Sequence, residues 1–274
     1  ISLHYFLELN TMKFIICLSL TLAFASAFVV PEVKDGLGGR ISNGDTAKPD
    51  QFPYQVGLQF YSGTENNGWC GGSIISNNWI LTAAHCTLGS TSVTVKLGSN
   101  IRTNPRVTRT AQQKDIIAHP GFTLQNLEHD LAVIKIDRIE YADDIQRVRL
   151  PTKASLYSDL VGEKIIVAGW GLNAGGTQPV NLQYAELTVI SNAVCQYSFN
   201  QYIDPTKLCV STRGGAESTC EGDSGGALVL ASSHVQVGIV SFGSWQGCTA
   251  PAPDVSTRVS SYLDWIKETT GVSG

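Results

Sequence analysis

Short runs of strand-forming residues, each bounded by turn residues, recur along the chain from residue 41 onward. Residues 54–60 alternate apolar and polar side chains, which is the period of a strand with one buried face. Similar runs, bounded by Gly, Asn, Ser or Pro, occupy residues 93–97, 131–136, 164–168, 187–190 and 235–240. Many short strands separated by turn signals are typical of antiparallel barrels or sandwiches, so we expect an all-β fold.

Helical signals are confined to two places. Apolar side chains repeat at helical spacing from Val259 to Ile266, ahead of Gly271, and predict a C-terminal helix. A shorter helix is expected to begin at Ser191 or Asn192. The glycine content favours a turn-rich β architecture, since 27 of 274 residues are Gly.

Composition limits the possible partners. Hydrophobic residues make up 43% of the chain and charged residues 15%, which excludes an intrinsically disordered segment. The net charge is −4 and no run of Lys or Arg occurs, so nucleic acid is not an expected partner. No linker, repeat or low-complexity tract interrupts residues 41–274, which predicts one domain there.

The first forty residues carry targeting signals. Met12 is the only methionine, so residues 1–11 are expected to be a translated leader ahead of the true start. Residues 12–27 join a Lys, a short apolar run and an Ala-Ser-Ala exit, which together predict a secretory signal peptide. A buried N-terminal helix or strand is the less favoured alternative. No other segment approaches the ~18 apolar residues of a membrane span, so we expect a secreted, extracellular protein without a membrane partner.

Cysteine usage agrees with export. Cys17 lies within the predicted signal, and six cysteines remain: Cys70, Cys86, Cys195, Cys209, Cys220 and Cys248. An even number in a secreted chain predicts disulfides, although sequence alone does not choose between the possible pairings. A zinc site is the competing interpretation, but no C-x-x-C or H-x-x-x-H spacing occurs.

Three motifs carry the chemistry. CEGDSGG, residues 220–226, places Ser224 among glycines, which is compatible with a tight turn or with a backbone that approaches a substrate closely. Upstream, LTAAHC contains His85 and HDLAVI contains Asp130. A serine hydroxyl needs a base with a pKa near neutrality to become a nucleophile, and the resulting imidazolium needs a carboxylate to orient it and offset its charge. The order His, Asp, Ser therefore indicates a catalytic triad.

With these motifs, residues 41–274 resemble the chymotrypsin-fold serine endopeptidases of the trypsin and chymotrypsin family. The resemblance implies two antiparallel six-stranded β-barrels with a C-terminal helix and the site between the barrels. It makes Ser224 the nucleophile, His85 the base and Asp130 the orienting acid, with an oxyanion hole formed by the backbone N–H groups of Gly222 and Ser224. It also implies the disulfides Cys70–Cys86, Cys195–Cys209 and Cys220–Cys248.

Substrate contacts follow from the same resemblance. Ser241 would donate a hydrogen bond to the triad aspartate, and Gly243, which follows Phe242, would pair with the substrate backbone as an added strand. Ser218 occupies the pocket position that holds Asp in trypsins and Ser in chymotrypsins, whereas Asp254 places a carboxylate on the pocket wall where both groups have Gly. This combination is similar to the collagenolytic serine proteases of crustaceans and insect larvae. It implies a chymotrypsin-like or broad specificity, of a kind that includes collagenolysis, and a digestive role.

Activation is the last implication. Gly-Gly-Arg40 followed by Ile41 resembles the cleavage site of a zymogen, so residues 28–40 would be a propeptide and the new N-terminus of Ile41 would bind Asp223. A trypsin-like protease would make this cut. The other implied partners are protein or peptide substrates and protein protease inhibitors, with the enzyme acting as a monomer. No cofactor or metal is expected, and the loop of residues 99–109 lacks the acidic side chains of a calcium site.

Two further functions are compatible with these motifs. A catalytically silent homologue could act as a binding or regulatory protein, but such proteins usually lack a triad residue and this chain retains all three. A regulatory protease of a clotting or immune cascade would commonly carry N-terminal accessory modules, whereas the expected propeptide is short.

Overall fold

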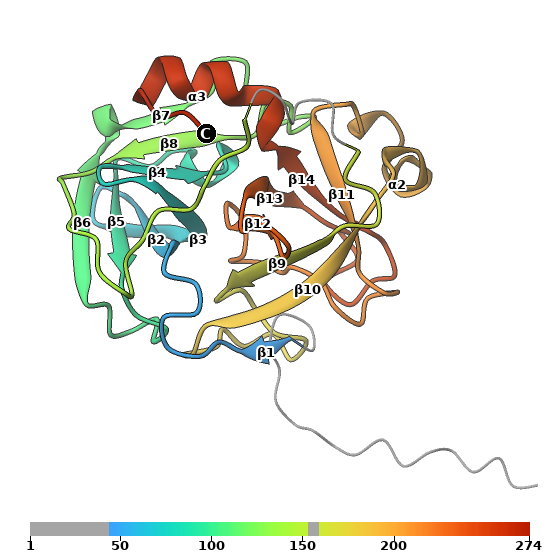
Figure 1. The fold of residues 1–274 in the computed structure, drawn as a ribbon, viewed down its shortest axis with the longest axis horizontal. Coiled ribbons are helices and arrows are strands. Elements are labelled where there is room, and N and C mark those ends of the chain that lie inside the picture. The colour runs from blue at the N-terminus through green and yellow to red at the C-terminus, as the bar shows by residue number, and fades with distance from the viewer. Residues whose placement is uncertain (1–43, 153–158) are drawn as a thin grey trace, which may run out of the picture. The chain divides into compact units, whose positions relative to one another are not determined.

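Two antiparallel sheets make up most of the computed structural model, which describes residues 44–152 and 159–274 (Figure 1). These described residues belong to one unit of the chain, residues 38–274. The predicted leader, signal peptide, propeptide and activation site, including Cys17, Arg40 and Ile41, lie outside the described residues.

The first sheet is closed by a divided strand. In spatial order it contains β6 (Val107–Gln112), β5 (Ser92–Leu97), β2 (Gln55–Ser62), β3 (Glu65–Ser76), β4 (Trp79–Thr82), β8 (Ala132–Lys135) and β7 (Ile116–Ala118). Only the 3₁₀ turn η3 (Gln113–Asp115) separates β6, which pairs with β5, from β7, which pairs with β8. The strands β6 and β7 are therefore two halves of one strand that joins the two edges of the sheet. Counted in this way, the sheet closes into a six-stranded barrel.

The second sheet closes directly. Its order is β1 (Asp45–Thr46), β10 (Gln183–Ile190), β11 (Lys207–Ser211), β14 (Asp254–Arg258), β13 (Gln236–Phe242), β12 (Ala227–Leu230) and β9 (Lys164–Gly169). Because β9 also pairs with β10, six strands form a ring, and the two-residue strand β1 adds to the outside of β10. The expected pair of six-stranded barrels is confirmed, with β1 as an unpredicted addition.

One expectation about burial is wrong. The alternation in residues 54–60 predicts a strand with one exposed face, but the first four residues of β2, Gln55 to Leu58, are all buried. At Gly57 the indole of Trp69 covers the outward face of the strand, since a Cβ there would overlap Cη2 of that ring. An alternating sequence identifies the apolar face of a strand. It does not show whether another element covers the opposite, polar face.

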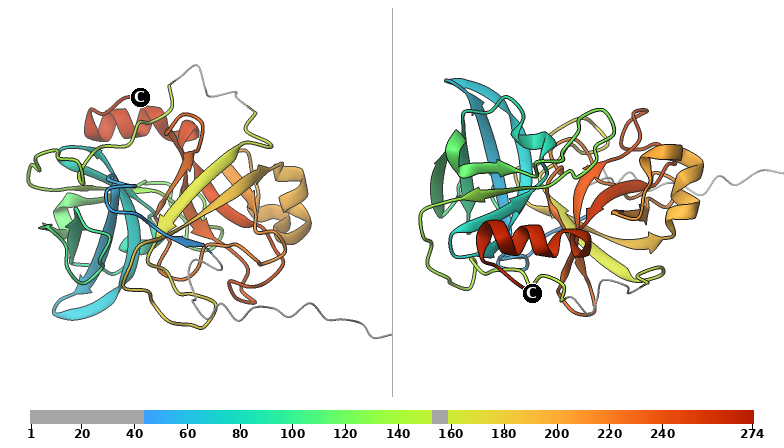
Figure 2. Two further views of the ribbon diagram at one scale, coloured as in Figure 1. Left: turned by 60° about the horizontal axis from the view of Figure 1, so that its bottom comes forward. Right: turned by 90° about the horizontal axis from the view of Figure 1, so that it is seen from above.

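The two predicted helices are confirmed. Helix α2 (Asn192–Phe199) is capped by Ser191, whose hydroxyl accepts a hydrogen bond from the N–H of Val194 at 3.3 Å. Helix α3 (Leu263–Thr270) follows the 3₁₀ turn η6 (Val259–Tyr262) and ends at Gly271, which has the left-handed φ of +77° that favours glycine there. Figure 2 shows α3 lying over the first barrel, although the chain reaches it from the second.

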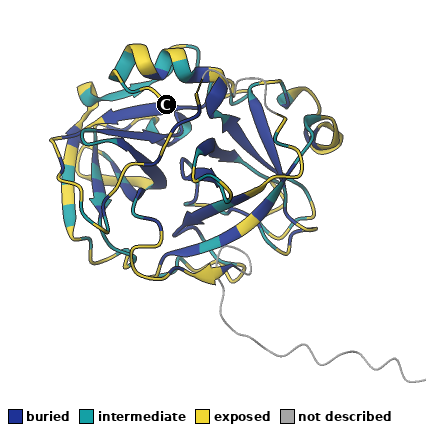
Figure 3. Cartoon of the chain, viewed as in Figure 1, coloured by how far each residue is buried: buried dark blue, intermediate teal, exposed yellow. Residues whose placement is uncertain are grey.

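Burial follows this architecture (Figure 3). The largest apolar cluster fills the first barrel, extends to residues of β9, β12 and β13 in the second, and includes Ile266 of α3, which ties the C-terminus to the N-terminal barrel. A second cluster, which includes Leu187 and Leu208, fills the other barrel, and a third gathers around Phe199 beneath α2. Among the helices that the structure describes, none is long and apolar enough to cross a membrane.

Three disulfides cross-link the described residues. They are Cys70–Cys86, Cys195–Cys209 and Cys220–Cys248. These are the three pairs that the family resemblance implies. The first holds β3 against the turn after β4, the second ties α2 to β11, and the third joins the loop before β12 to the loop after β13.

Candidate active site

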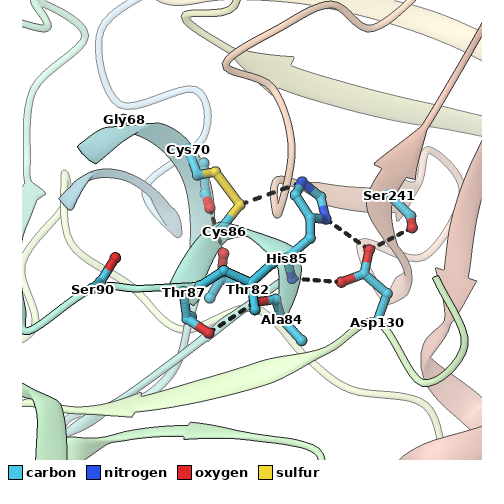
Figure 4. Close-up of a disulfide and its surroundings, with 12 residues drawn as sticks. Gly68, Cys70, Thr82, Ala84, His85, Cys86, Thr87, Ser90, Asp130 and Ser241 are labelled. Carbon is cyan, nitrogen blue, oxygen red and sulfur yellow. Dashed lines mark hydrogen bonds and ion pairs between the residues drawn. A yellow bond between two sulfur atoms is a disulfide. The ribbon is translucent and has the colours of Figure 1, made fainter. Parts of the chain in front are cut away.

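Neighbouring strand ends bring His85 and Asp130 together. His85 opens the 3₁₀ turn η2 (His85–Thr87) after β4, and Asp130 lies just before β8, the strand that pairs with β4. Nδ1 of His85 lies 2.8 Å from Oδ2 of Asp130, and the backbone N–H of His85 donates to Oδ1 at 2.9 Å (Figure 4). These two contacts fix the imidazole ring relative to the carboxylate and leave Nε2 as the ring nitrogen that does not face the acid.

The second barrel completes the surroundings of Asp130. Ser241 of β13 donates its hydroxyl hydrogen to Oδ2 at 2.5 Å, and Thr257 of β14 donates to the backbone carbonyl of Asp130 at 2.8 Å. Burial alone raises the pKa of this fully buried carboxyl, but the hydrogen bonds and charge of His85 and the Ser241 hydroxyl outweigh burial and hold the pKa below its usual value. Asp130 is therefore an anion held at the junction of the two barrels.

The loop that carries Ser224 packs against the strands that lead to His85. The N–H of Gly71 in β3 donates to the carbonyl of Ser224 at 2.8 Å. Gly225, with φ +79°, lies so close to β3 that a Cβ there would be 2.6 Å from the carbonyl oxygen of Gly71. Among the described residues no hydrogen bond joins Ser224 Oγ to His85, whose Nε2 lies 3.8 Å from Sγ of Cys86. Such contacts are often loose without substrate and tighten when it binds.

Among residues 222–226, two backbone N–H groups have no acceptor within the described chain. Asp223, Gly225 and Gly226 each donate their N–H to a backbone carbonyl. Gly222 and Ser224 donate theirs to no acceptor in the part of the chain that the structure describes. Gly222 has a φ of +96°, a conformation that favours glycine. Two free donors, two residues apart, can stabilise an anionic oxygen.

Asp223, between them, is a fully buried carboxylate. Its oxygens accept hydrogen bonds from the N–H of Gly171 at 2.8 Å and of Cys220 at 3.0 Å. The pKa of Asp223 is raised to about 7, chiefly by burial and also by the nearby charge of Asp254, while the two hydrogen bonds lower it in part. The described residues supply no cation to this carboxylate, and the partner expected for it, Ile41, lies outside them.

A pocket of about 270 Å³ opens beside Ser224. Its lining includes Ser241, Phe242, Gly243, Trp245 and Asp254, so most of the predicted substrate-binding residues lie together. Ser218 does not join them. It is 1% exposed and donates its hydroxyl hydrogen to the carbonyl of Cys248, a residue of the pocket lining.

Only one carboxylate oxygen of Asp254 accepts hydrogen bonds within the described chain. Its Oδ2 accepts hydrogen bonds from the N–H of Thr219 at 2.6 Å and from the hydroxyl of Thr219 at 2.8 Å. Its Oδ1 accepts none within the described chain and lies toward Gly243, where a Cβ would be 2.9 Å away. Burial raises the pKa of Asp254 to about 6, although Thr219 lowers it in part. Near neutral pH the pocket therefore contains a carboxylate with one oxygen free to bind a cation.

Sequence reasoning missed Thr219 and Trp245. Thr219 and Asp254 are 35 residues apart, so no local pattern connects them. The Cys220–Cys248 disulfide, which places the residues around Cys220 beside the pocket wall, is the signal from which Thr219 could have been found. Trp245 is 76% exposed at the pocket, and nothing in its sequence neighbourhood marks it.

The histidines not assigned to catalysis have other neighbours. His119 and His129 stack with ring centroids 4.8 Å apart, and Nδ1 of His129 lies 3.1 Å from the hydroxyl of Tyr262. The described residues bring only one group of three potential metal ligands together, namely Cys70, His85 and Cys86. Because its two sulfurs form a disulfide, they are not thiolate ligands, and we assign no metal there.

Comparisons with known proteins agree with this geometry. The model of the family described as "Trypsin" matches residues 41–266. "Serine protease 1" of Drosophila melanogaster is 42% identical over 242 residues, covering 88% of this chain and 89% of the relative. "Collagenase" of Hypoderma lineatum is 40% identical over 263 residues, covering 95% of this chain and 99% of the relative. A solved structure named HL collagenase superposes with a TM-score of 0.79 at 39% identity, covering 85% of this chain and 99% of that one.

Proposed function

Because the chain belongs to the trypsin family and is a serine endopeptidase, we propose that Ser224, His85 and Asp130 carry out its peptide hydrolysis. The observation that supports this most directly is the pairing of His85 with a buried, ionised Asp130 beside a serine loop with two free N–H groups. A base, an anion that orients it, a hydroxyl and two oxyanion donors are the parts that acyl transfer requires.

In the proposed reaction each of these groups has a defined role. Ser224 Oγ attacks the substrate carbonyl while His85 Nε2 takes the hydroxyl proton, and Asp130 offsets the charge of the imidazolium. The N–H groups of Gly222 and Ser224 bind the oxyanion, where losing one donor typically costs about 3 to 4 kcal/mol. His85 then gives the proton to the leaving amine, and a water molecule hydrolyses the acyl-enzyme by the same steps.

A serine-directed phosphonate probe tests this assignment. We expect the probe to abolish hydrolysis of a general protein substrate and, by mass spectrometry of the tryptic peptides, to be attached to Ser224. Labelling should be lost after heat denaturation, because only the folded site lowers the barrier to attack by this hydroxyl. Attachment to a different serine, with hydrolysis abolished, would contradict the role given to Ser224.

We also propose that the enzyme is secreted as an inactive precursor. The signal-like residues 12–27 and the six paired cysteines support export, and the sequence around Arg40 supports activation by a trypsin-like protease. In this proposal the ammonium group of Ile41 binds Asp223 after the cut and stabilises the loop that carries the oxyanion donors. A monomer that digests extracellular protein and is controlled by protein inhibitors is the role we propose.

The specificity that we propose is broad. An ionised Asp254 attracts a substrate Arg or Lys with about 4 kcal/mol at an effective dielectric near 20, before desolvation removes part of that gain. Burying a Leu or Phe side chain in the pocket contributes about 1.5 to 3 kcal/mol. Because the two gains are comparable, cleavage should follow Leu, Phe and Tyr as well as Arg and Lys. Similarity to proteins named collagenase makes collagen a candidate substrate.

Replacing Asp254 with Gly should lower kcat/KM after Arg and Lys by about tenfold or more while cleavage after Phe holds or rises, since the pocket loses its anion. The measurement is kcat/KM on matched peptides that differ only in the residue before the cut. Asp254→Asn is the matched control for size, because its amide oxygen can still accept the hydrogen bonds of Thr219. An unchanged basic-to-aromatic ratio in both variants would refute the role of Asp254.

The basic-to-aromatic ratio of kcat/KM should also depend on pH, which gives a second test of the role of Asp254. With the pKa of Asp254 at about 6, the carboxylate is charged above that pH and neutral below it. The basic-to-aromatic ratio of kcat/KM should therefore fall by about tenfold between pH 8 and pH 5, with a midpoint near 6. Both substrates use the same catalytic groups, so effects of pH on the catalytic step itself cancel from the ratio. A ratio that stays flat across this range would contradict the assignment.

A further inference from the structure

An indole ring flanked by two cations lies beside the loop of the proposed oxyanion donors. Trp69 of β3 approaches Gly222 so closely that a Cβ there would be 3.4 Å from Cδ1 of the indole. Nζ of Lys96 lies 5.1 Å from the centroid of the Trp69 ring, and Cζ of Arg102 lies 5.7 Å from it. Both distances are within the range of cation–π attraction, so the ring holds an ammonium and a guanidinium near one another.

Neither cation is neutralised by an ion pair within the described residues. The ion pairs of the other Arg and Lys side chains there involve neither Lys96 nor Arg102. Arg102 donates from Nε to the carbonyl of Pro179 at 3.2 Å. Burial, and then the positive charge of Arg102, lower the pKa of Lys96, as expected for two like charges held close together. An anion bound between them would relieve this repulsion.

The position of these side chains relative to the reaction follows from His85. The base returns its proton to the leaving amine through Nε2, so the leaving group must lie near that atom. Nε2 is 3.8 Å from Sγ of Cys86, and the disulfide connects Cys86 to Cys70, the residue after Trp69 (Figure 4). Trp69 directly precedes this disulfide, and its ring borders the proposed oxyanion donor Gly222. From these two relations we infer that Trp69 and its cations lie on the leaving-peptide side of the site, whereas the Asp254 pocket lies on the acyl side.

We propose that Trp69, Lys96 and Arg102 form a subsite for a carboxylate in the leaving peptide, downstream of the bond that is cut. The inference rests on the proposed function and deepens it by adding a preference that the Asp254 pocket does not supply. Its ligand is either an Asp or Glu side chain in the first residues after the bond or the free C-terminal carboxylate of a short leaving peptide. The side chains of both cations are half-buried and lie against an apolar ring, so their attraction for an anion is stronger than that of cations fully surrounded by water.

Matched peptides separate these possibilities. All share one acyl side that ends in Phe, and they carry Glu or Gln at the first, second or third position after the bond, with an amidated C-terminus. One further peptide has only Gln and a free C-terminal carboxylate. The trypsin-treated wild type, the Lys96→Gln/Arg102→Gln double variant and a Lys114→Gln control are compared. Lys114 is exposed on the 3₁₀ turn between β6 and β7, so its loss changes net charge away from Trp69.

We expect the wild type to cleave at least one carboxylate-bearing peptide about three- to tenfold faster in kcat/KM than its Gln counterpart. The position of that carboxylate shows whether a side chain or the C-terminus is bound. The preference should disappear in the double variant, persist in the control, and weaken in the wild type at 1 M NaCl, where the Debye length is about 3 Å. All three proteins should still cleave the Gln peptides, which also shows that the variants fold.

Two failures are distinguishable. If no peptide is cleaved by any of the proteins, the proposed function is overturned, and the subsite with it. If the Gln peptides are cleaved but no carboxylate accelerates cleavage by the wild type, the subsite alone is overturned. A preference that survives in the double variant also overturns the subsite. A preference of the wild type that does not weaken at 1 M NaCl overturns it as well, without any substitution.

Discussion

Ser224→Ala is expected to lower kcat for peptide hydrolysis on the order of 10⁶-fold, as in related triads. The variant loses the nucleophile, and no other group in the proposed site can form the acyl-enzyme. What remains is the catalysis that the oxyanion donors and substrate binding contribute to direct attack by water. The measurement is kcat of the activated variant on a peptide that the wild type cleaves, with contaminating protease removed by affinity purification.

Controls separate loss of chemistry from loss of fold. Ser232→Ala, at an exposed position on the turn between β12 and β13, should retain wild-type kcat and the same melting temperature. His85→Ala combined with Ser224→Ala should be no slower than Ser224→Ala alone, because residues that act as one unit do not contribute additively. Near wild-type turnover by Ser224→Ala would eliminate the triad assignment.

Arg40→Gln should leave the precursor inactive after trypsin treatment, with activity at least about a hundredfold below that of the treated wild type. Trypsin does not cut after Gln, so the ammonium of Ile41 would never form. Asp223 would then stay buried without its proposed cation, and breaking a buried pair from one side costs about 3 to 5 kcal/mol. Activity is measured before and after treatment, and the new N-terminus is identified by mass spectrometry.

The propeptide contains its own matched control. Lys34→Gln removes another basic residue from residues 28–40 but retains the Arg40–Ile41 bond, so the treated variant should reach wild-type activity. If the Arg40→Gln precursor resisted trypsin yet hydrolysed peptides at the full wild-type rate, the activation proposal would be wrong. The roles of Ser224, His85 and Asp130 would be unaffected by that outcome, because they do not depend on how Asp223 is paired.

Local sequence patterns were sufficient to predict many of the strands, the C-terminal helix and the catalytic motifs of this protein. The alternation and turn residues predicted strands where β2, β5, β8, β9, β10 and β13 form, and the spacing before Gly271 predicted α3. These features depend on neighbours along the chain, where backbone propensity and periodicity act. The motifs around His85, Asp130 and Ser224 were likewise visible as short sequences, because each motif lies on a single turn or strand end. Their family resemblance then supplied the fold.

Contacts between distant segments were decided by the tertiary structure alone. Asp254 takes its raised pKa of about 6 from burial and its fixed orientation from Thr219. The alternation in residues 54–60 predicted an exposed face that Trp69 covers at Gly57, and the buried hydroxyl of Ser218 donates to the carbonyl of Cys248, which lies 30 residues away. Burial, hydrogen bonding and charge act through space, so two residues acquire a shared environment only when closure of the barrels brings their strands together.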